Sequence, residues 1–192
     1  MLTILKRMII ALAAVALLGT GSIFASSPAP PGTSETDDLA YLSDRASMLL
    51  VEIKKEAAEL TRHADTLRTF AGNPRYSWQS HTFYLNKVKG HINAVGERTA
   101  ELQQIRYAVL PWQEQAIAEV TSHAAKVAAS TQAAIIYLNE NQGRHFVPEY
   151  RDHLTAIADS SEDMKQTVDK FLDYEKTQEK FQRLQNELEL GG

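Results

Sequence analysis

The sequence predicts an all-α protein, an antiparallel up-down-up-down four-helix bundle with a long C-terminal helix. Residues 37–190 contain only three prolines and are rich in Ala, Glu, Gln, Lys and Leu, which favour helices. Their apolar residues recur every three or four positions, and no segment alternates in the manner of a strand. The three predicted connections between helices are a few residues long, which favours antiparallel neighbours. We found no internal repeat.

The first two predicted helices cover residues 37–71 and 77–109. Asp37 and Asp38 suit the positive N-terminal end of the first helix, and Gly72-Asn73-Pro74 ends it. Ser77 is the expected N-cap of the second helix. The predicted core stripe of the first helix is Leu42, Ala46, Leu49, Ile53, Ala57, Leu60, Ala64, Leu67 and Ala71. That of the second helix is Trp78, His81, Leu85, Val88, Ile92, Val95, Thr99 and Leu102.

The third and fourth predicted helices cover residues 111–141 and 147–189, and Gly143 with Pro148 ends the third. The third stripe is Ile117, Val120, Ala124, Val127, Thr131, Ala134 and Leu138. The fourth stripe is Tyr150, Leu154, Ile157, Ser161, Met164, Val168 and Phe171, followed by Phe181, Leu184 and Leu188. The fourth helix is about ten residues longer than its neighbours, and its apolar spacing continues to the end.

The joint around Pro111 permits a second arrangement. Pro111 suits the first position of a helix, but no Gly or Asn marks a turn before it. A continuous helix kinked at Pro111, with two helical hairpins side by side, is therefore the alternative to a bundle with a turn at this point.

The first 25 residues have the pattern of a secretory signal peptide. Lys6 and Arg7 precede an apolar core of 11 residues from Met8 to Leu18, and Ala25 offers a small residue for cleavage. Such a core rises only about 16 Å as a helix, roughly half the thickness of a bilayer's hydrocarbon. We expect cleavage after Ala25, an uncleaved anchor being the alternative. Residues 26–36, rich in Pro and Ser, are expected to form a disordered linker before the domain at 37–190.

Charge and cysteine content exclude several functions. The chain has no cysteine, so disulfides, thiolate metal sites and a cysteine nucleophile are absent. Without Lys6 and Arg7, 18 basic residues stand against 24 acidic ones, a net charge near −6. An acidic chain is not suited to nucleic acid, which requires a basic face. The mature chain is expected to have no stable membrane insertion and to be periplasmic or extracellular.

The histidines are the strongest candidates for a metal site. Three of them follow a glutamate by four residues: Glu59/His63, Glu119/His123 and Glu149/His153. Counting along antiparallel helices places His63, His81 and His153 within roughly 6 Å along the bundle axis. Only His81 falls on a core stripe, however, and no Glu-x-x-His pair of a carboxylate-bridged di-iron site is present. We therefore expect solvated helix flanks and no metal, with convergence of the three left open.

Haem and catalysis have weaker support. Met48 and His123 come to similar depths and would be the axial ligands of a haem, but both lie beside their stripes, and a Met there usually fills space. The chain also lacks a Gly-rich phosphate loop, HExxH and GxSxG. We expect no cofactor, no catalytic residue and no enzymatic activity.

Two polar-aromatic connectors lie at opposite ends of the predicted bundle. They contain Trp112, Gln113 and Glu114 in one and residues 139–146, with Phe146, in the other. We interpret them as caps in which Trp112 and Phe146 close the core, contact with a partner being the alternative. The segments LPWQEQA and LNENQGRHFVPEY resemble uncharacterised exported bacterial helical proteins of unknown function. The resemblance covers about half of the mature chain and implies no activity.

The expected function is that of an exported, non-enzymatic interaction or structural protein of the cell envelope. Phe181, Leu184 and Leu188 are expected to bind a protein partner or a second copy, because a solvated helix end has no need of an apolar stripe. The alternative is a periplasmic bundle, sensory or redox, that holds a ligand, a metal or haem.

Overall fold

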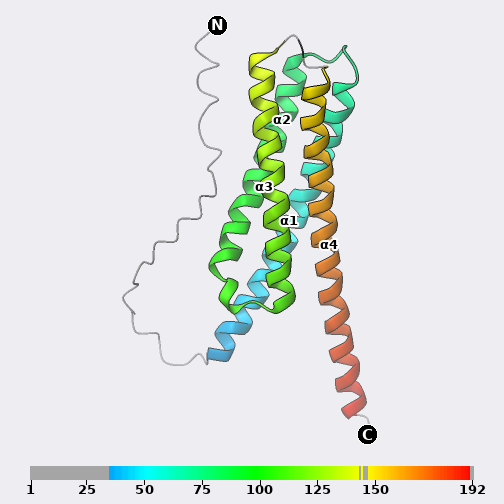
Figure 1. Ribbon diagram of the computed structural model, residues 1–192. Coiled ribbons are helices and arrows are strands. Elements are labelled where there is room, and N and C mark those ends of the chain that lie inside the picture. The colour runs from blue at the N-terminus through cyan, green and yellow to red at the C-terminus, as the bar shows by residue number, and fades with distance from the viewer. Residues whose placement is uncertain (1–34, 143, 145–146, 191–192) are drawn as a thin grey trace, which may run out of the picture.

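The computed structural model describes residues 35–142, 144 and 147–190, and these form an all-α bundle. The helices are α1 (Glu35–Ala71), α2 (Trp78–Gln104), α3 (Pro111–Glu140) and α4 (Pro148–Leu190), with a short 3₁₀ turn, η2 (Arg106–Ala108). The long helices lie side by side (Figure 1). α1 packs against α2 and α4, and α3 packs against the same two helices, so chain neighbours are neighbours in space. The predicted up-down-up-down bundle is confirmed.

The predicted apolar stripes form one core. Every residue predicted on the first stripe from Ala46 onward is buried, as are all those predicted on the third. On α4 the stripe is buried from Tyr150 to Phe171. Thr131 and Ser161 are fully buried among these apolar residues, and the Ser161 hydroxyl donates to the carbonyl of Ile157 one turn earlier. The core therefore ends on α4 near Leu172, well before the end of the helix.

A turn, not a kink, precedes Pro111. α2 ends at Gln104, five residues earlier than predicted, and η2 follows it. Val109 and Leu110 are extended, and Pro111 occupies the first turn of α3. Because proline has a fixed φ and no N–H to lose, it begins the new helix without cost. The alternative of one kinked helix is wrong.

Other helix boundaries differ from the prediction by one or two residues. α1 begins at Glu35, so its first turn includes the last two residues assigned to the linker. Ser77 caps α2 as predicted, its hydroxyl accepting a hydrogen bond from the Ser80 amide. The predicted signal peptide, the rest of the predicted linker and Phe146 lie outside the described residues. Within the described part of the chain, no helix combines the length and apolarity needed to cross a membrane.

Candidate functional site

His81, near the start of α2, is buried in the core as its position on the predicted stripe implied. Its Nδ1 lies 3.2 Å from the hydroxyl of Tyr150 on α4. Tyr150 is fully buried and its ring stacks on that of Tyr137 from α3. Burial raises the pKa of the Tyr150 phenol, which stays protonated at neutral pH and can donate to His81. Through its contacts with His81 and Tyr137, Tyr150 links α2, α3 and α4 at one end of the core.

His63 on α1 is also buried, which corrects the prediction that it lies on a solvated flank. Its ring stacks on that of His91 from α2, with centroids 5.3 Å apart, and also contacts Tyr84. His81 instead contacts Phe70, seven residues along α1 from His63, or roughly 10 Å further along the axis. His63 and His81 therefore belong to different levels of the bundle.

One group in the described part of the chain has the geometry of a metal site. Ligand atoms of Glu59, His63 and His91 lie within 4.8 Å of one another, and neither His81 nor His153 belongs to this group. Sequence reasoning missed His91 because it precedes Ile92 of the core stripe, and its meeting with His63 depends on how α1 and α2 are aligned. The signal in the sequence was the Glu59/His63 pair alone.

The residues around this group do not favour a cation. The Arg62 guanidinium donates to the Glu59 carboxylate and lies 3.3 Å from Nε2 of His63. The Glu56 carboxylate pairs with Nδ1 of His91 at 2.8 Å. A metal would have to displace the guanidinium, whose own positive charge already neutralises Glu59. We interpret the group as a packed seam between α1 and α2.

His63 makes the stability of this seam depend on pH. Burial, followed by the charges of Arg62 and His91, lowers the pKa of His63 below its ordinary value. The unfolded chain then binds the proton more readily, so the stability contribution is complete above about pH 6.5 and is lost as the pH falls below it. The other groups that face His63 are Glu59 on the same helix and Lys87 on α2.

We expect His63→Phe to reduce the loss of stability between pH 7.5 and pH 5.5. Phenylalanine keeps a ring against His91 and Tyr84 but cannot take up a proton. Urea unfolding of the two chains at both pH values measures the difference, with His153→Gln as the control. If the wild type and His63→Phe lose the same unfolding free energy between pH 7.5 and pH 5.5, protonation of His63 is not the cause of the loss.

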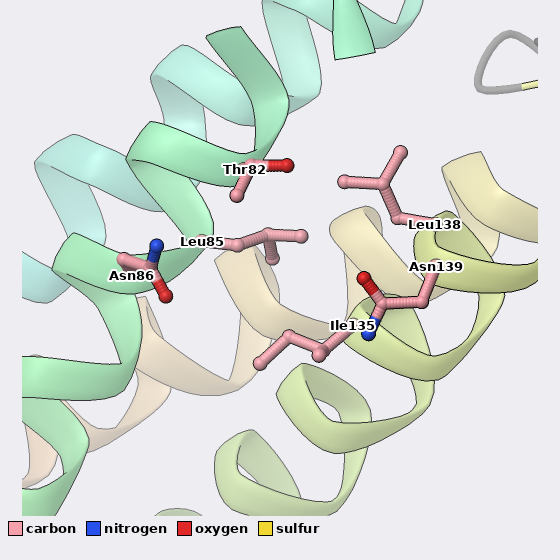
Figure 2. A pocket seen from close by; sticks show the side chains of 6 residues that line it. All are labelled: Thr82, Leu85, Asn86, Ile135, Leu138 and Asn139. Atoms are coloured by element: carbon pink, nitrogen blue, oxygen red, sulfur yellow. The ribbon is translucent and has the colours of Figure 1, made fainter. Parts of the chain in front are cut away.

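A cavity between α2 and α3 is too small for a ligand. It encloses about 10 Å³, which is room for about one water molecule. Figure 2 shows that Leu85 of α2 and Ile135 and Leu138 of α3 line it, with Thr82, Asn86 and Asn139 around them. This cavity does not hold a cofactor of the size of haem. Met48, which a haem site would need as an axial ligand together with His123, is 57% exposed on the surface of α1.

Gln113 in the first turn of α3 is a fully buried amide that ties together one end of the bundle. Its Oε1 accepts from the Leu110 amide at 2.8 Å and from the Ser43 hydroxyl at 3.1 Å. Its Nε2 donates to the Ser43 carbonyl at 2.9 Å and to the Ser47 hydroxyl at 3.0 Å. Ser47 in turn donates to Glu175 of α4. The connector predicted as a cap thus joins α1, α3 and α4 through hydrogen bonds.

α4 continues beyond this end of the bundle, as Figure 1 shows in red. We call residues 174–190 the α4 extension. Its apolar side chains are exposed: 57% for Phe181, 48% for Leu184 and 79% for Leu188. Tyr174 begins the same stripe and contacts Trp112 of α3, with ring centroids 6.1 Å apart. The extension is therefore a helix with an apolar stripe that no described part of the chain covers.

A shallow groove of about 470 Å³ opens beside η2. It lies between the start of α1 and the α2–α3 connection, and it is lined by Leu39, Ala40, Ser43, Asp44, Tyr107, Ala108, Val109 and Leu110. Tyr107 is largely exposed there, and Leu110 is half exposed. The start of α3 is thus close both to this groove and, through Trp112, to the α4 extension.

Comparison with known proteins identified no relative. No family model, no curated protein and no solved structure matches the chain. The functional argument therefore rests on the geometry of this chain.

Proposed function

We propose that this protein is an exported, non-enzymatic interaction or structural module of the cell envelope, whose α4 extension binds another helix. The observation that carries the proposal is the exposed stripe of Phe181, Leu184 and Leu188, on the part of α4 that extends beyond the bundle core. Burial of each such side chain is worth roughly 1.5–3 kcal/mol, and exposure gains nothing. Amphipathic helices of this kind dock against other helices through anchors spaced by three and four residues.

The rest of the molecule supports a module that presents this helix. The described residues hold the extension at its base, since Glu175 bonds with Ser47 and Tyr174 contacts Trp112. A helix continued from a folded bundle needs no nucleation of its own, so less conformational entropy is lost on binding. The signal-peptide pattern of residues 1–25 supports export.

The test compares the full chain with a chain truncated after Lys176, both expressed with their own leader in the native host. We expect both to begin at Ser26 by intact mass, and we expect their bundles to melt within about 2 °C of each other because the core ends before Lys176. The full chain should capture an identified protein, a second copy included, that rebinds in purified form, whereas the truncated chain should not.

Three results would contradict this proposal. Unfolding of the truncated chain would make the extension part of the core. Capture of the same protein by both chains would place the docking surface elsewhere. Retention of residues 1–25 in the membrane fraction would contradict release from the membrane after export.

A further inference from the structure

We infer that the partner of the α4 extension is a second copy of this chain, paired with it in antiparallel orientation. This inference rests on the proposed function, because it names the helix that covers the stripe. Its starting point is the spacing of Tyr174, Thr177, Phe181, Leu184 and Leu188, whose steps alternate between three and four residues. This is the heptad pattern of a two-stranded coiled coil.

The residues that flank the stripe differ on its two sides. One flank carries Lys180 and Glu187, seven residues apart and of opposite charge. The other flank carries Gln178 and Gln185, which are neutral. In an antiparallel pair, residues of one flank meet residues of the same flank on the other helix, whereas in a parallel pair opposite flanks meet. The charge pattern therefore distinguishes the two orientations.

In one antiparallel register the stripe residues of the two copies pack against each other and the charged flank residues pair with opposite charges. When Phe181 packs against Leu184 of the partner subunit, Thr177 lies opposite the partner's Leu188. The same register places Lys180 beside the partner's Glu187. The twofold axis repeats each contact, so the interface contains two such ion pairs and is self-complementary. The Gln178 and Gln185 side chains of the two copies meet on the other flank.

The parallel orientation lacks these advantages. It would place Lys180 beside the partner's Gln185 and form no ion pair on the extension. It would also bring the bundles side by side along the same face of α4. The preceding heptad positions on that face are Lys170, Thr167 and Asp163. In a parallel pair Lys170 would face Lys170 of the partner subunit and Asp163 would face the partner's Asp163, and each of these like-charged pairs is repulsive. The antiparallel orientation keeps the two bundles at opposite ends of the shared rod.

In the antiparallel register Lys176 lies opposite the partner's Glu189, so the described part of the partner's helix reaches the base of the extension. There it lies close to Tyr174, which already contacts Trp112 of α3. α3 itself runs antiparallel to α4, so the partner's helix runs in the same direction as α3. The interface is short, and we expect a dissociation constant on the order of 10 μM.

The test is sedimentation equilibrium of the purified mature chain between about 5 and 500 μM. The variants are Lys180→Glu, Glu187→Lys and the double variant, with Arg183→Glu on the outer face of the extension as the matched control. Each single variant replaces two attractive pairs with two repulsive ones, and we expect about tenfold weaker dimerisation. The double variant restores both pairs and should return to within about twofold of the wild type.

Each other outcome overturns the inference in a recognisable way. A wild-type chain that is monomeric at 500 μM excludes the second copy, while capture of a different protein by the extension would leave the proposed function intact. A dimer that survives truncation after Lys176 has its interface elsewhere. Single variants that dimerise as tightly as the wild type, or a double variant that stays weak, exclude this register. Circular dichroism confirms that every variant remains folded.

Discussion

Tyr150→Ala is expected to lower the free energy of unfolding by about 4 kcal/mol. The Tyr150 ring is fully buried between Tyr137 of α3 and His81 of α2, at the end of the core where α4 begins. Alanine would leave a cavity among side chains of three helices, which can close only partly. Chemical denaturation of the purified mature chain measures the loss.

Tyr150→Phe separates the hydroxyl from the ring. This variant keeps the packing but removes the group that lies 3.2 Å from Nδ1 of His81, and we expect a loss of about 1 kcal/mol. Tyr107→Ala serves as the surface control, because Tyr107 is 79% exposed, and its effect should stay below about 0.5 kcal/mol. Equal losses for Tyr150→Ala and Tyr107→Ala would show that the Tyr150 ring does not lie in the core.

Gln113→Ala is expected to lower the free energy of unfolding by about 3 kcal/mol. The substitution removes four hydrogen bonds that the buried Gln113 amide makes with Ser43, Ser47 and Leu110 at partly buried contacts. Each such bond contributes about 0.5–1.5 kcal/mol, so the summed loss exceeds that of one exposed hydrogen bond. For a domain of this size the midpoint of thermal unfolding should fall by about 9 °C.

Gln115→Ala is the matched control for Gln113→Ala. Gln115 lies two residues later on the same helix, and its exposed amide donates a hydrogen bond to Glu119 one turn away. We expect a change below about 0.5 kcal/mol. If the two variants have the same midpoint of thermal unfolding, the Gln113 amide does not hold α1, α3 and α4 together.

The spacing of apolar residues was enough to predict the helices and their buried faces. Positions such as Leu60, Val127 and Leu154 lie at intervals of three or four, and a helix brings such residues onto one face that water disfavours. Two connections were also predictable, because Gly72 with Pro74 and Gly143 with Pro148 disfavour a continued helix, whereas the turn before Pro111 carries no such pair of residues. Even the exposed stripe of α4 was visible, since Phe181, Leu184 and Leu188 keep the helical spacing beyond the other helices.

The tertiary structure decided which side chains meet across helices. The stack of His63 on His91, beside the ion pair of Arg62 with Glu59, depends on how α1 and α2 are aligned along the bundle axis. A shift of one helical turn between them would separate the two rings by about a further 5 Å. The contacts of Gln113 with Ser43 and Ser47 join residues about 70 positions apart in the chain. Local spacing carries no information on such contacts, because they depend on how whole helices pack. The sequence by itself determined the helices and their apolar faces, and packing decided where those faces stop being covered.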